Sequence, residues 1–226
     1  MKGDRATRVF SPLLKALILL LGVMGQYLAL NGSKPASGAH FLYYTNISNI
    51  LVSLLAFALL ALELRALGAG KALALPRWLG KVRFALTVGI LLTFVVFSLL
   101  LIPKMPLNYL ASPSNLLLHN LVPLLASLDF ILFSHNKGEG LTVWNGTALP
   151  LAYFVFVFGL MLSGVRFSGS AAPYYFLDFQ KNGWFAIGGE KFGVFWWLLI
   201  ITGLTLVFSK ILLVLQKFVV RHTLNA

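Results

Sequence analysis

The sequence contains no cysteine, and charged residues are scarce. Only 11% of its 226 residues are charged, against about 25% in an average soluble domain. The lack of cysteine excludes disulfides, thiolate nucleophiles and thiolate metal sites. Acidic residues are the rarest charges, with six against 18 Lys and Arg, so the formal net charge is +12. Basic residues beside apolar segments set membrane topology and bind anionic lipid headgroups, so this charge does not imply a nucleic acid partner.

Hydrophobic residues, in contrast, make up 59% of the chain, and the mean hydropathy is +0.88. Each main apolar segment approaches or exceeds the roughly 20 residues that a helix needs to cross a bilayer. We therefore predict an all-α, polytopic membrane protein, in which residues 1–226 form one domain of six helices in a bundle. The first segment exceeds the usual signal-peptide core, so we expect an uncleaved span. The six predicted spans cover about 10–30, 41–64, 83–102, 115–134, 148–165 and 193–216.

Basic residues are distributed unequally between the two sets of loops. The N-terminus, the 65–83 connection, which includes Arg83, and the C-terminus are rich in Lys and Arg, whereas the opposite loops hold fewer. The positive-inside rule therefore predicts that both termini are cytoplasmic. Two acidic residues fall in predicted helices: we expect Asp129 to pack against a Ser or Tyr, and Glu63, beside Arg65, to be interfacial.

The second predicted span begins with four small polar residues, Thr45, Asn46, Ser48 and Asn49, before an unbroken apolar run. Thr45, Ser48 and Asn49 are spaced i, i+3 and i+4, so they share one helical face. Polar side chains inside a span face the bundle interior and often mark function. The same residue types also serve only to hold helices together.

A histidine in the fourth predicted span strengthens the functional interpretation. Asn115 and His119 are spaced i and i+4, and Pro123 removes the hydrogen bond that the His119 carbonyl would accept. Spans two and four both enter from the predicted outer face, which places Thr45 and His119 at similar depths, roughly 7 Å inside. The sequence therefore predicts a polar pocket that opens toward the outer leaflet.

Further candidates for substrate binding lie near the same face. Tyr153 is in the fifth span, and Arg166 begins the long outer loop 166–192, where a cation suits a carboxylate or phosphate headgroup. The aromatic residues of this loop suit the membrane interface, and we expect a lid or a re-entrant plug. The four histidines form no ligand set, and no nucleotide-binding or zinc-protease motif occurs, so we expect no metal and no cofactor.

Four segments together resemble one family of membrane proteins. YYTNISNILVSL, LLHNLVPLLASLDFILF, LPLAYFVF and PYYFLDFQKNGW occur in the order and spacing of the androgen-induced-gene-like six-span family, bacterial branch. The likeness covers spans two to five and the last outer loop. It implies a hydrolase of fatty acid esters of hydroxy fatty acids in the bacterial plasma membrane, with Thr45 as nucleophile and His119 as base.

The chemistry of the residues is consistent with those roles. A threonine hydroxyl is a poor nucleophile unless a nearby base removes its proton, and a neutral imidazole suits that task. Asn49 or Asn115 would then orient the imidazole or donate to an oxyanion. Two alternatives stay open: a non-catalytic lipid- or partner-binding membrane protein, and a small transporter component. A transporter should carry polar residues to both faces, whereas spans two and four turn apolar below the pocket, except at Asp129.

Overall fold

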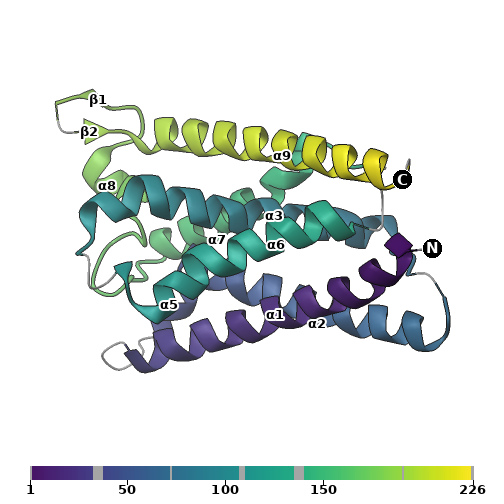
Figure 1. The fold of residues 1–226 in the computed structure, drawn as a ribbon. Helices are drawn as coiled ribbons and strands as arrows, with labels where there is room; N and C mark the ends of the chain where they lie inside the picture. Colours follow the sequence, from purple (N-terminus) through teal and green to yellow (C-terminus); the bar gives the residue numbers. More distant parts are fainter. Residues whose placement is uncertain are drawn as a thin grey trace.

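The long helices lie side by side along the length of the molecule, and both termini lie at the same end (Figure 1). The computed structural model describes residues 2–32, 38–71, 73–106, 110–134, 140–189 and 191–224. We call the end with the two termini the terminal end. The other end, which carries the strands β1 (Ile187–Gly188) and β2 (Lys191–Phe192), is called the loop end.

The prediction of six transmembrane helices in an all-α protein is confirmed. In the part of the chain that the structure describes, six helices are long and apolar enough to cross a membrane. Their boundaries differ from the predicted ones by up to six residues, and helix ends are the least reliable part of any hydropathy argument. The six segments are Val9–Gly32, Tyr44–Gly68, Arg77–Leu101, Pro113–Phe133, Val143–Leu162 and Val194–His222.

Several of these segments combine more than one kind of helix. The α-helices that contribute to them are α1 (Lys2–Gly32), α2 (Tyr44–Gly68), α3 (Arg77–Val96), α5 (Pro113–Asn115), α6 (Val122–Phe133), α7 (Ala148–Leu162) and α9 (Val194–Leu224). Two π-helical turns interrupt them, η2 (Phe97–Leu101) after α3 and η4 (Leu116–Leu121) before α6. Shorter elements are η1 (Gly38–Leu42), η3 (Ile102–Lys104), η5 (Val143–Thr147), η6 (Tyr175–Leu177) and α8 (Phe179–Asn182).

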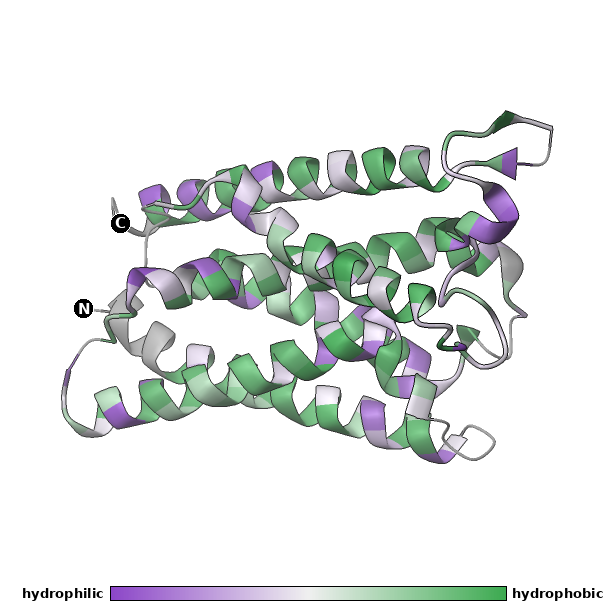
Figure 2. Cartoon of the chain, turned by 180° about the vertical axis from the view of Figure 1, so that it is seen from behind, coloured by the Kyte–Doolittle hydropathy of each residue, from purple (hydrophilic) through white to green (hydrophobic). Residues whose placement is uncertain are grey.

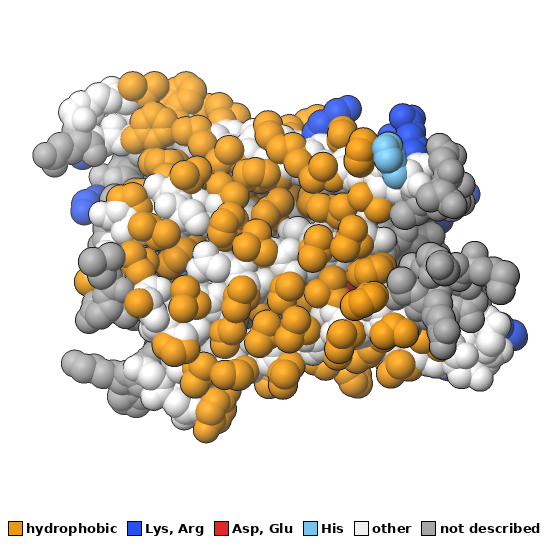
Figure 3. Space-filling view, in the orientation of Figure 1, with side chains coloured by type: hydrophobic (Ala, Val, Ile, Leu, Met, Phe, Trp, Pro, Cys, Tyr) orange, Lys and Arg blue, Asp and Glu red, His pale blue; other side chains and the backbone are white. Residues whose placement is uncertain are grey.

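The outside of the bundle is apolar. Hydrophobic residues dominate the helices in Figure 2, and hydrophobic side chains cover the middle of the face drawn in Figure 3, with the visible Lys and Arg toward its ends. Large side chains such as Leu20 and Val155 are 63% and 70% exposed. Such a surface is unfavourable in water, at about 25 cal/mol per Å², but it suits the hydrocarbon core of a membrane.

Glycine residues allow the first helix to approach its neighbours closely. A Cβ atom at Gly22 of α1 would lie 2.1 Å from Ser53 Oγ of α2, and one at Gly25 would lie 2.6 Å from a Leu118 methyl carbon. Because lipid tails are as apolar as leucine, helices in membranes associate through close packing and polar contacts, which favours small residues at their interfaces. These glycines bring α1 against both α2 and the η4 turn.

Four charged side chains form a buried network in the half of the bundle nearer the terminal end. Lys15 Nζ lies 2.9 Å from Asp129 Oδ1 and 3.2 Å from Glu63 Oε2, and Arg83 Nη2 lies 2.6 Å from Asp129 Oδ2. Their exposed fractions range from 0% for Lys15 to 5% for Asp129 and Glu63. Lys15 also donates to Ser11 Oγ at 2.7 Å. We name Lys15, Glu63, Arg83 and Asp129 the charge network.

The charge network overturns three predictions. Asp129 pairs with two cations instead of a Ser or Tyr, Glu63 is buried instead of interfacial, and Arg83 is a buried partner instead of a loop charge. The physical reason is that a buried carboxylate needs opposite charges, and these come from other helices. These cations are far from the two acidic residues in the chain, so the neighbouring sequence does not reveal the pairing.

Candidate active site

Two π-helical turns face each other near the loop end. In η4 the Val122 N–H donates to the Leu117 carbonyl, and after η2 the Ile102 N–H donates to the Phe97 carbonyl, both five residues back. The His119 ring of η4 stacks on the Phe97 ring of η2, with centroids 3.9 Å apart and an interplanar angle of 26°. Such turns insert a residue into a helix and frequently occur at functional sites.

The proline after His119 explains the backbone at this point. In the i+5 register of η4, the Leu118 carbonyl would accept from residue 123, but Pro123 has no N–H. Asn49 Nδ2 of α2 donates to this carbonyl instead, at 2.9 Å, and also donates to the Thr45 carbonyl at 2.8 Å. The carbonyl that Asn49 binds is that of Leu118 and not that of His119, which was predicted to lose its hydrogen bond. Asn49 thus connects the backbone of Thr45 with the turn that carries His119.

A cavity of about 670 Å³ opens between these elements. Four of the predicted site residues line it, namely Thr45, Asn46, Asn115 and His119. His119 is 8% exposed, so its ring is buried in the wall of this cavity. Thr45 and His119 are both described, and no hydrogen bond joins the Thr45 hydroxyl to the His119 ring. Catalytic hydrogen bonds often form or shorten only when substrate is bound.

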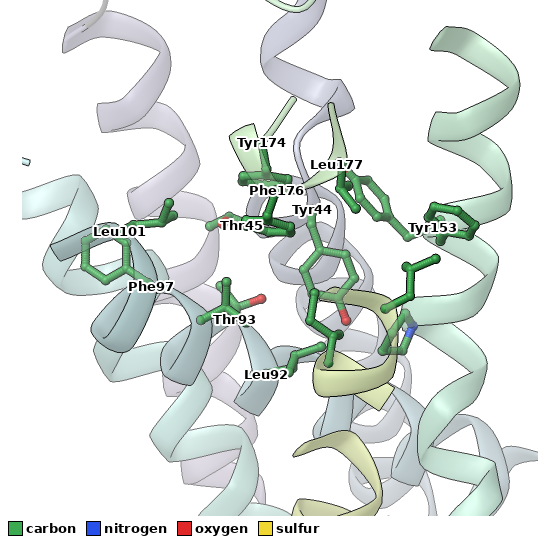
Figure 4. Close-up of a pocket in the computed structure, with 15 residues that line it drawn as sticks. Tyr44, Thr45, Leu92, Thr93, Phe97, Leu101, Tyr153, Tyr174, Phe176 and Leu177 are labelled. Atoms are coloured by element: carbon green, nitrogen blue, oxygen red, sulfur yellow. The ribbon is translucent and has the colours of Figure 1, made fainter. Parts of the chain in front are cut away.

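A second, smaller cavity of about 70 Å³ lies on the other side of Thr45, and Figure 4 shows its wall. Leucine, phenylalanine and tyrosine side chains from α2, α3, α7, α9 and the outer loop dominate its lining. Four residues line both cavities: Thr45, Phe97, Leu101 and Tyr174. The Thr45 side chain therefore lies at the junction of a large cavity and a small one.

The other predicted residues lie outside this junction. Ser48 Oγ bonds to Thr93 Oγ1 at 3.0 Å and donates to the Thr45 carbonyl, so it ties α2 to α3 and lines neither cavity. Tyr153 lines the smaller cavity, and its hydroxyl donates to the Leu42 carbonyl at 3.1 Å. Arg166 is exposed and lines neither cavity.

Tyr174 is a site residue that the sequence analysis did not identify. The outer loop brings its ring over Thr45 (Figure 4). Burial raises the pKa of the Tyr174 hydroxyl to about 12, and hydrogen bonds with the Thr45 side chain, the Thr45 backbone and the Tyr44 backbone lower it in part. The phenol therefore keeps its proton at physiological pH. The sequence contains two adjacent tyrosines in an aromatic cluster, and nothing in that pattern distinguishes Tyr174 from Tyr175.

Neither a metal-ligand cluster among the described residues nor a similar known protein helps to assign a function to the site. Within the residues described, no three His, Asp or Glu side chains lie close enough together to hold one metal ion. Comparison of the chain with protein-family models, with curated proteins and with solved structures found no match.

Proposed function

We propose that the protein is a membrane-embedded hydrolase of lipid fatty-acyl esters, with Thr45 as nucleophile and His119 as general base. The main support for this proposal is that Thr45 and the buried His119 line the same cavity. The apolar cavity on the other side of Thr45 suits the few methylene groups of an acyl chain that lie next to the ester. With both termini in the cytoplasm, as the basic loops predict, the site would take its lipid from the outer leaflet.

The reaction proceeds in two steps. In the first, His119 removes the proton of the Thr45 hydroxyl as Oγ1 attacks the ester carbonyl carbon, and the alcohol leaves with that proton. In the second, water attacks the acyl-threonine while His119 again acts as base, which releases the fatty acid and restores Thr45. The Tyr174 hydroxyl, which forms a hydrogen bond with the Thr45 side chain, would donate to the carbonyl oxygen as it becomes negative.

A non-catalytic lipid-binding protein is the second candidate. The observation that favours it is that, among the described residues, no hydrogen bond joins the Thr45 hydroxyl to the His119 ring. A binder needs the two cavities but has no requirement for an activated hydroxyl. The two candidates therefore differ in the reactivity of Thr45.

A fluorophosphonate probe tests this reactivity directly. An activated hydroxyl displaces fluoride from phosphorus and becomes covalently labelled. We expect labelling of the purified wild-type protein and its loss in Thr45→Ala and His119→Ala. Thr205→Val is the matched control, because Thr205 is fully buried and its hydroxyl only donates within α9, to the Ile201 carbonyl at 2.7 Å.

The other outcomes are equally informative. Wild-type protein that stays unlabelled would favour the lipid-binding candidate. Labelling that survives Thr45→Ala would show that a different residue is the nucleophile.

The role of Tyr174 gives a separate prediction. Tyr174→Phe removes the hydroxyl but keeps the ring, so we expect kcat for ester hydrolysis to fall roughly tenfold or more while KM changes little. Tyr27→Phe is the control, because Tyr27 is 65% exposed and lines neither cavity. Equal rates for Tyr174→Phe and wild type would remove Tyr174 from the mechanism.

A further inference from the structure

The side chain of Asn49 lies between the helix that carries Thr45 and the turn that carries His119. Asn49 is fully buried, with an exposed fraction of 0%. Its Nδ2 donates to the Thr45 carbonyl of α2 at 2.8 Å and to the Leu118 carbonyl of η4 at 2.9 Å. A side-chain amide has two hydrogens on its nitrogen. Both hydrogens therefore bind backbone carbonyls, one in each of the two segments that carry the proposed nucleophile and base.

These contacts exclude a direct role for Asn49 in the chemistry. With both amide hydrogens bound to carbonyls, Asn49 has no hydrogen to donate to an oxyanion or to an imidazole. Asn49 also lines neither cavity, so it does not touch a substrate held in either one. Of the two roles considered for Asn49 from the sequence, this leaves the positioning of His119, through the backbone of its turn.

The carbonyl that Asn49 binds in η4 belongs to the same peptide unit as the His119 N–H. A peptide unit is planar, so a hydrogen bond to the Leu118 carbonyl also fixes the orientation of the backbone at His119. The Thr45 carbonyl fixes the backbone at Thr45 in the same way. From this backbone the His119 ring reaches the Phe97 ring, on which it stacks with centroids 3.9 Å apart. One side chain therefore controls the relative position of both proposed catalytic residues.

We infer that Asn49 is a positioning residue, which holds α2 and η4 at the spacing that lets His119 act on the Thr45 hydroxyl. This inference rests on the proposed function. Ser48 provides a comparison, because it donates to the same Thr45 carbonyl but links it to Thr93 of α3 instead of η4. Without Asn49 the two segments are free to shift, and a displacement of about 1 Å between catalytic groups costs about 10²-fold in rate.

The first test is Asn49→Val, which removes both hydrogen bonds. The assay measures hydrolysis of p-nitrophenyl butyrate, a short ester with a coloured product, by purified protein in neutral detergent. We expect kcat to fall at least about thirtyfold, because Thr45 and His119 lose their relative position. KM should change less than about threefold, because Asn49 lines neither cavity.

The second variant, Asn49→Thr, has the shape of the first but restores a local hydrogen bond. Buried threonines of this protein donate to the carbonyl four residues back, as Thr87 does to Arg83 at 2.8 Å and Thr205 does to Ile201 at 2.7 Å. A hydroxyl at position 49 can bind the Thr45 carbonyl in this way, but it is too short to reach Leu118. We expect the same loss of kcat with a smaller loss of stability, so this variant carries the test if Asn49→Val does not fold.

Ser127→Ala is the matched control for the loss of a buried hydrogen bond. Ser127 is 7% exposed, and its hydroxyl donates to the Pro123 carbonyl at 2.8 Å, close to the same break in the helix. It lies in α6 and lines neither cavity. We expect a lower unfolding temperature and an unchanged kcat for this variant, which separates a loss of stability from a loss of positioning.

A double variant tests whether Asn49 acts through His119. Residues that act as a unit are not additive, so Asn49→Val added to His119→Ala should lower the remaining rate by less than about twofold. If Asn49→Val has its full effect in the absence of His119, Asn49 does not act by positioning this base and the inference is overturned.

The wild-type protein separates the two levels of failure. If it hydrolyses the ester in a Thr45-dependent manner and folded Asn49→Thr keeps the wild-type kcat, the positioning role fails and the hydrolase proposal stands. If the wild-type protein does not hydrolyse the ester, the hydrolase proposal itself fails, and the role of Asn49 in it fails as well.

Discussion

Thr45→Ala should reduce ester hydrolysis by at least about 10³-fold, which corresponds to about 4 kcal/mol of lost transition-state stabilisation. The methyl group of alanine supplies no nucleophile, and water alone must attack the ester. His119→Ala should cost a similar factor, because the hydroxyl then has no base. The double variant should be no worse than either single one, since the two side chains act as a unit.

The measurement is the steady-state rate of acyl release by protein that elutes as a single folded species in detergent. Thr205→Val is again the control and should keep the wild-type rate, because Thr205 lies in α9 and lines neither cavity. Thr45→Ser keeps a hydroxyl and should retain part of the activity. A Thr45→Ala protein with unchanged kcat/KM would refute the nucleophile assignment.

Asp129→Ala should destabilise the protein by about 3–5 kcal/mol, because it leaves Lys15 and Arg83 buried without their shared carboxylate. Arg83 also donates to the Asp129 and Phe133 carbonyls, so its position depends on this region of α6. Thermal unfolding of the detergent-solubilised protein should shift down by roughly 10 °C or more.

Two comparisons sharpen this prediction. Asp178→Ala is the matched control, since Asp178 only accepts a bond from the Lys181 N–H at the start of α8, at 3.0 Å, and losing such a cap costs about 1 kcal/mol. Adding Arg83→Met to Asp129→Ala removes the cation that has lost its carboxylate and should recover part of the loss, whereas Lys15 keeps its ion pair with Glu63. A change of less than 1 kcal/mol for Asp129→Ala would mean that the charge network contributes little to stability.

The six spans could be predicted from the sequence because hydropathy is a property of each segment by itself. The positions of Thr45 and His119 on one cavity also follow from local rules, namely the depth of each residue in its helix and the face it occupies. The second and fourth spans are predicted to enter the bilayer from the same side, so residues at equal depth in the two helices lie at the same level of the membrane. Their proposed chemistry stays a prediction.

Other features depend on which helices become neighbours, and a single sequence does not give this. The partners of Asp129 come from α1 and α3, more than a hundred and more than forty residues away in the chain. The η4 turn depends on its pairing with α2 through Asn49, because an unpaired Leu118 carbonyl would be unfavourable in a membrane. The contact of Tyr174 with Thr45 depends on the path of a loop that has little regular structure.

The position of the charge network also affects which amino-acid substitutions the fold can accommodate. Its ion pairs connect α1, α2, α3 and α6 in one half of the bundle, and the two cavities lie in the other half. None of its four members belongs to α7 or α9, whose side chains line the small cavity. Substitutions that reshape the cavities therefore leave the strongest polar contacts of the fold intact. The residues around the cavities can therefore change at one end of the bundle while the polar contacts at the other end maintain the fold.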